Sequence, residues 1–161
     1  MHESSSGSES IVSMIPNAML RAGFMGVKTK PYILVLTGQR IIFARVTNEM
    51  LKQAVAQARD GAESEGKGFF AQWGAQLTAY SDLASRYLVT PPEQILHENP
   101  DNFAVDRSAI VKAKLKTGSA DDNGADTSDR LILKTTGKTY TIVLNTSIAS
   151  AKQALAAAGL I

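Results

Sequence analysis

The stretch YILVLTGQRIIFARV, from Tyr32 to Val46, decides how this chain folds. Its β-branched and aromatic residues stand on both sides of a short turn, Thr37-Gly38-Gln39, which is a strong signal for a β-hairpin. Successive residues of a strand point to opposite faces, and here both faces are apolar. The sequence therefore predicts a hairpin that is covered on both sides.

A second unit of the same kind is DRLILKTTGKTYTIVLN, from Asp129 to Asn145, with its turn at Thr135-Thr136-Gly137-Lys138. Short apolar runs bounded by turn residues predict the other strands. Glycines inside the first of these runs indicate a curved strand. The remaining strands are expected at Ala18 to Val27, Phe103 to Val105 and Ile110 to Thr117.

Helical patterns fill the middle of the chain and its end. Thr47 is a plausible N-cap for a helix through about Arg59. A second helix, from about Phe69 to Leu88, carries an apolar stripe that is typical of packing on a sheet. The stripe consists of Phe69, Trp73, Leu77, Tyr80, Ala84 and Leu88.

Two further helices have clear start and stop signals. Thr90-Pro91-Pro92-Glu93 has the spacing of a capping box, so Thr90 is expected to cap a short helix that ends near His97. The last helix is expected from Ser147 to Ala158, with Gly159 as its stop. Both predictions rest on local residue chemistry alone.

The composition indicates a single cytoplasmic domain. The chain has 161 residues and no cysteine, which gives no indication of an oxidising compartment. The polar start lacks the pattern of a secretory leader and no apolar run reaches the ~20 residues that span a bilayer, so we expect neither export nor a membrane span. Residues 1–13 are polar and expected to be a disordered tail, and residues 14–161 are expected to form one domain.

The inventory of reactive side chains is small. The two histidines, His2 and His97, have no partner residues at metal-ligand spacing, and no nucleotide-binding or nucleophile motif is present. The segment Asp121 to Asp126 lacks the closing glutamate of a calcium loop and is interpreted as a solvated loop. We therefore expect no catalytic residues, no metal, no cofactor and no enzymatic activity.

Basic residues gather in the front half of the chain. No acidic residue occurs between Ile11 and Asn48, a stretch that is either an anion-facing surface or an ordinary solvated one. On the strand at 110–117, lysines at alternate positions share one face. They could contact phosphates or an anionic membrane, but we favour the interpretation that they guard an exposed strand edge. These lysines are Lys112, Lys114 and Lys116.

Both hairpins resemble those of a known family. LVLTGQRIIFARV looks like the "xhxLTxxRhhh" hairpin of the bacterial pleckstrin-homology-like and GRAM-like families, and LILKTTGKTY is similar to their "hhhkTxdGkxh" hairpin. The match covers residues 18–46 and 108–160. It implies an α+β fold, a pleckstrin-homology-like bent antiparallel β-barrel of two sheets with a C-terminal capping helix. Here a helical insertion at about 48–98, between the third and fourth strands, departs from the pattern and could be a lid or a binding element.

Function is expected to be binding. The first hypothesis is a non-enzymatic cytoplasmic binding or scaffolding module for a protein or peptide. The alternative is a peripheral membrane module for anionic lipid headgroups, because the resemblance places phosphate binding near the first hairpin. Its residues would be Arg21, Lys28, Lys30 and Arg40. The net charge of +2 is too small to favour nucleic acid. If neither lipids nor a partner bind, self-association through exposed sheet edges is the next candidate.

Overall fold

The computed structural model describes residues 9–22, 28–50, 52, 53, 56, 83–118 and 129–161. Short helical segments lie at 48–50 and 83–88. The other elements are β1 (Ile11–Ala22), β2 (Lys28–Thr37), β3 (Arg40–Arg45), α4 (Pro92–His97), β4 (Phe103–Asp106), the 3-10 turn η2 (Arg107–Ala109), β5 (Ile110–Lys116), β6 (Arg130–Thr135), β7 (Thr139–Leu144) and α5 (Ile148–Ala157).

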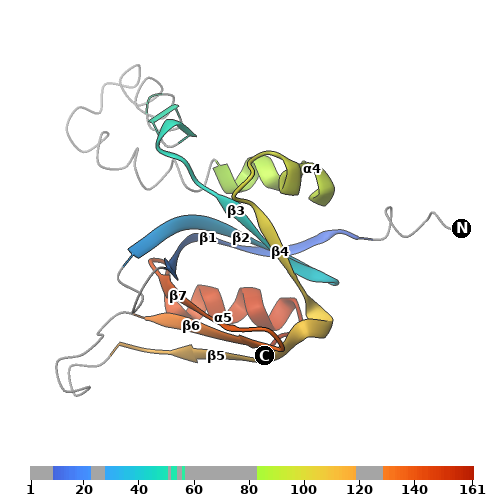
Figure 1. Ribbon diagram of the computed structural model, residues 1–161, viewed down its shortest axis with the longest axis vertical. Helices are drawn as coiled ribbons and strands as arrows, with labels where there is room; N and C mark the ends of the chain where they lie inside the picture. Colours follow the sequence, from blue (N-terminus) through green and yellow to red (C-terminus); the bar gives the residue numbers. More distant parts are fainter. Residues whose placement is uncertain (1–8, 23–27, 51, 54–55, 57–82, 119–128) are drawn as a thin grey trace, which may run out of the picture.

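The described strands form one antiparallel sheet in the order β4-β3-β2-β1-β7-β6-β5 (Figure 1). The expectation of two separate sheets was wrong in this respect. The reason is β1, which pairs with β2 along most of its 12 residues and also with β7 through Ala18, Met19 and Leu20. Because one long strand serves both neighbours, its hydrogen bonds join the two halves into a single sheet.

The first hairpin is buried on both faces, as predicted. One face, with Leu34 and Phe43, joins a core that also contains residues of α5, β6 and β7. The opposite face packs against the 83–88 segment and α4, so these parts of the insertion are a second core layer (Figure 1). That layer consists of Ile33, Val35, Ile42, Ala44, Val46, Leu83, Ala84, Tyr87 and Ile95.

Aromatic rings join strands that are far apart in the sheet order. Phe103 of β4 stacks on Phe43 of β3 at 4.4 Å between ring centroids. Phe103 also stacks on Tyr140 of β7, at 5.8 Å, although β4 and β7 are not hydrogen-bonded neighbours. Offset stacking of this kind adds to the stability gained by burying the rings.

The start of the first strand differs from the prediction. β1 begins at Ile11 rather than at Ala18, so residues 11–13, which were assigned to the tail, belong to the strand. A register shift between Ile15 and Ala18 accommodates Pro16, which cannot donate to a ladder. The predicted end of this strand, at residues 23–27, and residues 1–8 of the tail lie outside the described residues.

The helix caps were predicted with mixed success. Thr47 caps as expected, because its Oγ1 accepts a hydrogen bond from the Met50 amide at 3.1 Å. The capping box at Thr90 was wrong: Pro91 occupies the N-cap position of α4 without a side-chain bond. Thr90 instead donates its hydroxyl to the Arg86 carbonyl, at 2.8 Å. The preceding helical turn ends there, and the Arg86 carbonyl, which also accepts from the Val89 amide at 3.3 Å, competes with the cap position for the hydroxyl.

The predicted apolar stripe of the second helix is largely outside the described residues, Trp73 included. In the described part, Ala84 is buried as expected, whereas Leu88 is 60% exposed. Tyr87 takes the inward position and is 1% exposed. The steps of four in the stripe drift around a helix of 3.6 residues per turn, which explains the one-residue difference.

The C-terminal helix α5 packs on β1. Its predicted cap is confirmed, since Ser147 Oγ accepts from the Ser150 amide at 3.1 Å. Leu155 is fully buried, and Ser13 of β1 donates its hydroxyl to the Ala154 carbonyl at 2.7 Å. Gly159 ends the helix with a φ of +75°, a conformation that favours glycine. In the described part of the chain, no helix is long and apolar enough to cross a membrane.

Candidate functional site

The strand β5 ends the sheet, and among the described residues its strand partner is β6 alone. The β5–β6 register places Lys112 opposite Lys134 and Lys116 opposite Arg130. Paired residues of antiparallel strands point to the same face, with Cβ atoms about 4.5–5.5 Å apart. The row of lysines predicted on β5 therefore continues across β6 on the outer face of the sheet.

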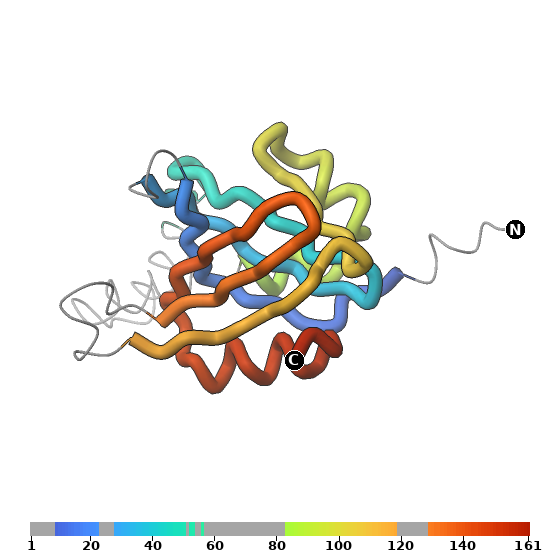
Figure 2. Tube along the Cα trace, turned by 60° about the horizontal axis from the view of Figure 1, so that its bottom comes forward, coloured from blue at the N-terminus to red at the C-terminus, as the bar shows by residue number. Residues whose placement is uncertain are grey.

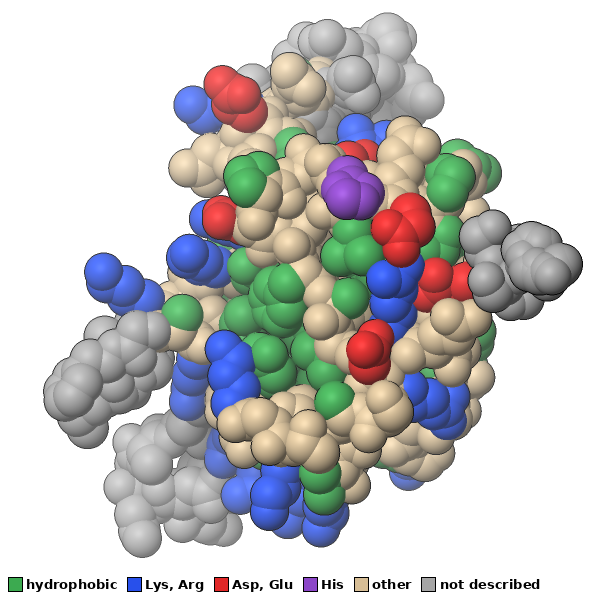
Figure 3. Space-filling model, turned by 45° about the vertical axis from the view of Figure 1, so that its right-hand side comes forward, with side chains coloured by type: hydrophobic (Ala, Val, Ile, Leu, Met, Phe, Trp, Pro, Cys, Tyr) green, Lys and Arg blue, Asp and Glu red, His purple; other side chains and the backbone are tan. Residues whose placement is uncertain are grey.

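The basic residues of this outer face, which we call the basic ladder, are Lys112, Lys114, Lys116, Arg130 and Lys134; Ile132 lies opposite Lys114 on the same face. All four lysines are exposed. Like charges directly opposite each other on a sheet are unfavourable, and Lys112 and Lys134 are such a pair. Figure 3 shows Lys and Arg side chains gathered at the lower end of the molecule, where Figure 1 draws β5 and β6.

The inner face of β5 is apolar and incompletely covered. Ile110, Ala113 and Leu115 are half-buried and pack against the main core. Two residues at the ends of the α5 region, Ile148 and Leu160, are half-buried against the same core, and Figure 2 shows α5 running below β5. The core thus thins out toward the β5 edge, where further apolar side chains would add burial.

The predicted alternation along β5 fails at one position. Strict alternation would place Val111 on the same face as Ala113 and Leu115, but Val111 is 60% exposed. The cause is a register shift between Ile110 and Lys112, which inserts an extra residue into this strand. From Lys112 onward the alternation is as predicted.

A second cluster, the Arg40 centre, ties three distant parts of the chain together. Arg40 binds Glu9 through two bonds, Nε to Oε2 at 2.8 Å and Nη2 to Oε1 at 2.9 Å. The same Nη2 reaches Glu93 of α4 at 2.9 Å, and the buried hydroxyl of Thr37 donates to Glu9 at 2.9 Å. The hydrogen bonds that Arg40 donates to Glu9 raise the pKa of Arg40, and the bond that it donates to Glu93 lowers the pKa of Glu93.

Two open pockets flank the Arg40–Glu93 pair. One, of about 640 Å³, is walled by the β2–β3 turn, Pro91 and Pro92, Asp106 and Ser108. The other, of about 600 Å³, includes Leu96, His97 and Asn99. The purple histidine in Figure 3 borders red and blue side chains on this surface.

The Arg40 centre cross-links separate segments of the chain through ion pairs. Its guanidinium already holds two carboxylates, and His97, which is 81% exposed, lies 3.6 Å from Glu93. Its hydrogen bonds are the two ion pairs of Arg40 and the bond from the buried Thr37 hydroxyl to Glu9, and all of them join separate segments of the chain. Nowhere in the described ranges do three His, Cys, Asp or Glu side chains gather to hold a metal.

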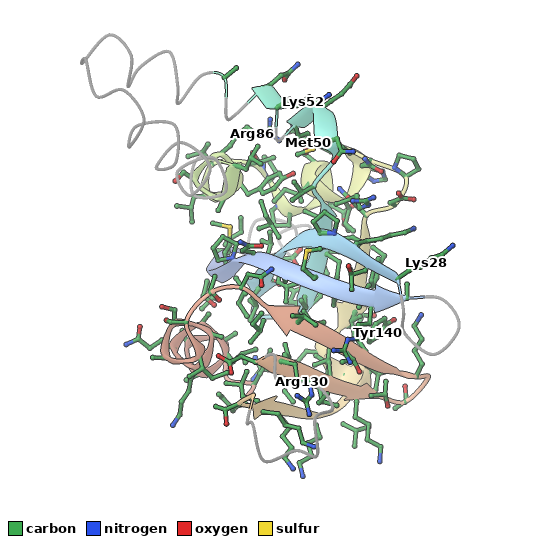
Figure 4. All side chains as sticks on the ribbon, turned by 90° about the vertical axis from the view of Figure 1, so that its left-hand side faces the viewer. Lys28, Met50, Lys52, Arg86, Arg130 and Tyr140 are labelled. Atoms are coloured by element: carbon green, nitrogen blue, oxygen red, sulfur yellow. The ribbon has the colours of Figure 1, made fainter. Side chains whose placement is uncertain are left out.

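The four basic residues of the membrane hypothesis do not form one site. Three of them lie at the end of β1 and the start of β2, which pair with each other: Arg21, Lys28 and Lys30 (Lys28 is labelled in Figure 4). Arg21 is opposite Thr29. Arg40 lies beyond the other end of β2. Lys30 and the last residue of that strand, Thr37, are seven residues apart, which is roughly 23 Å at the ~3.3 Å that each residue of a strand spans. Arg40 is also engaged by Glu9 and Glu93, so it belongs to a different feature of the molecule.

Sequence reasoning missed three participants. Glu9 lies in a segment taken for a disordered tail, and no local signal marks it. Arg130 and Lys134 alternate on β6, but their place beside the β5 lysines follows only from the register. Comparison of the chain with models of protein families, with curated proteins and with solved structures found no match.

Proposed function

We propose that this protein is a non-enzymatic binding module that recognises an extended segment of a partner protein or peptide by adding it to the edge of β5. The observation that carries the proposal is the open edge itself. Beyond β6, β5 has no strand neighbour in the described part of the chain. Such an edge presents a row of backbone N–H and C=O groups that a further strand can satisfy.

The fold that supports this function is, we infer, a bent barrel of the pleckstrin-homology-like and GRAM-like type. Three features support the inference: β1 pairs on both sides, α5 packs on β1, and Phe103 contacts Tyr140 across the core. The helical insertion lies between β3 and β4 and is partly core packing on the first hairpin. A barrel that leaves β5 at its edge holds that strand rigid for a partner.

The Arg40 centre is a weaker candidate for the binding site than the β5 edge. Its charges already satisfy one another, so a partner would have to replace the Glu9 or Glu93 bonds. The alternative of an anionic headgroup site at Arg21, Lys28, Lys30 and Arg40 is likewise less well supported. Its members stand at opposite ends of β2, whereas a headgroup site needs its cations together.

The test is selection of extended peptides followed by mapping on the protein. The full chain would be screened against a displayed library of random heptapeptides, and backbone amide exchange would be measured with each selected peptide. Strand addition should slow exchange of β5 amides, because they become hydrogen-bonded. A library that yields no binder, or binders that protect amides elsewhere, would refute the proposal.

Strand addition also has a backbone signature that the peptide can report. Amides of successive residues in a strand point to opposite edges. Each selected peptide would be made in two N-methylated forms, one at the odd-numbered and one at the even-numbered amides. The form methylated at the amides that point toward β5 should lose binding, and the other form should keep it. Equal effects of the two methylation patterns would mean that the peptide binds through its side chains alone.

A further inference from the structure

We infer that the β5 edge selects a partner segment in which acidic residues alternate with apolar ones. The inference rests on the proposed function, because it names the chemistry of the strand that β5 accepts. Its basis is the two different faces of β5. The outer face carries the basic ladder, and the inner face carries half-buried apolar side chains.

On the outer face, an added strand would stand directly beside the lysines. Lys112, Lys114 and Lys116 would each face one of its outward residues, because paired residues share a face. Opposite charges across a strand pair are favourable, and like charges are unfavourable. Lys134 lies on β6 opposite Lys112, is exposed, and strengthens the preference for acidic residues.

On the inner face, the same strand would place its alternate residues next to Ala113 and Leu115. These two side chains are half-buried at the rim of the main core, against which Ile148 and Leu160, from the two ends of the α5 region, are also half-buried. Apolar residues of the partner would be removed from water there, which is favourable in proportion to the area buried. Acidic residues outward and apolar residues inward give a strictly alternating pattern.

The same ladder disfavours other occupants. A second copy pairing β5 against β5 would bring lysines next to lysines, which is unfavourable. A neutral or basic segment would lose the charge pairs or meet repulsion. The lysines that protect the edge from indiscriminate pairing therefore also define the partner that it accepts.

The experiment compares three hexapeptides that differ only at their outward positions. One alternates glutamate with valine, one threonine with valine and one lysine with valine. Each would be titrated into the full-length protein by fluorescence anisotropy, with backbone exchange of the β5 amides measured in parallel. Three opposite-charge pairs should favour the glutamate peptide over the threonine peptide about 3- to 100-fold at low salt. The preference should shrink at 1 M salt, where the Debye length is about 3 Å.

Charge reversal supplies the matched variant. Lys112→Glu combined with Lys114→Glu should invert the order, so that the lysine peptide binds best. Lys52→Glu is the control, because Lys52 is exposed on the insertion and Figure 4 draws it at the opposite end of the molecule from Arg130. The control variant should keep the preference for glutamate. A stable melting temperature would confirm that each variant is folded.

The outcomes separate the inference from the proposed function. Equal binding of the glutamate and threonine peptides, with β5 amides protected by both, would overturn the inference and leave the function standing. No binding and no protection by these peptides or by any selected peptide would refute both. Binding of acidic lipid vesicles that depends on Lys112 and Lys114, without strand addition by any peptide, would instead assign the ladder to a membrane.

Discussion

The carboxylate of Glu9 and the guanidinium of Arg40 form a two-pronged ion pair between residues that are 31 positions apart in the chain. The side chains are 9% and 16% exposed, so solvent screens the pair only weakly. Glu9 also accepts the buried hydroxyl of Thr37. These bonds join the segment just before β1 to the two residues that flank the β2–β3 turn, Thr37 and Arg40.

We expect Glu9→Gln to destabilise the protein, because hydrogen bonds to charged groups contribute about 1.5–3 kcal/mol each and the amide keeps only part of them. Chemical denaturation would measure the change. Glu49→Gln, at an exposed helical position, is the control and should stay within about 0.5 kcal/mol. An unchanged Glu9→Gln protein would mean that the ion pair does not hold in solution.

The Arg40–Glu93 bond predicts that the stability of the fold decreases at acidic pH. The pKa of Glu93 is lowered from 4.5, chiefly by the hydrogen bond from Arg40. A carboxyl group with a lowered pKa stabilises the fold above its unfolded value and loses that contribution as pH falls through its folded value. Glu93→Gln lacks this component. The difference in melting temperature between wild type and variant should therefore narrow between neutral pH and about pH 3; a constant difference would contradict the prediction.

The buried hydroxyl of Tyr87 predicts that the stability of the fold decreases at strongly basic pH. Burial, with the neighbouring Glu98 carboxylate that accepts its hydroxyl at 2.9 Å, raises the pKa of Tyr87 to about 12. A raised pKa means that the stabilisation is complete below pH 10.0, the ordinary value, and disappears as pH rises through about 12. Thermal melts should show this loss in wild type and not in Tyr87→Phe. Below pH 10 the variant should be less stable by about 1.5–3 kcal/mol, because it loses a hydrogen bond to a charged group.

Ile95 tests whether the insertion belongs to the core. It is fully buried against the outer face of the first hairpin. Ile95→Ala should cost about 2–5 kcal/mol, the usual range for a large buried aliphatic residue replaced by alanine. Val89→Ala is the matched control, because Val89 is 85% exposed and should change stability by no more than about 0.5 kcal/mol. Similar denaturation midpoints for the two variants would show that α4 does not pack as described.

Local patterns were enough to predict the elements with strong signals. The first hairpin, the Ser147 cap of α5 and the end of α4 at His97 depend on residues close together in the sequence. Alternation at period two and capping chemistry are read within a few residues. The prediction failed where two local signals competed, as at Thr90, whose hydroxyl chose the Arg86 carbonyl over the cap.

The sequence by itself determined the hairpins, the closing helix and the row of lysines on β5. Only the tertiary structure decided that β1 joins both halves into one sheet, that Glu9 binds Arg40, and that Arg130 and Lys134 extend the lysines into a ladder. These relationships connect residues far apart in the chain. They are set by strand register and by the packing of the whole core, and no short stretch of sequence contains that information.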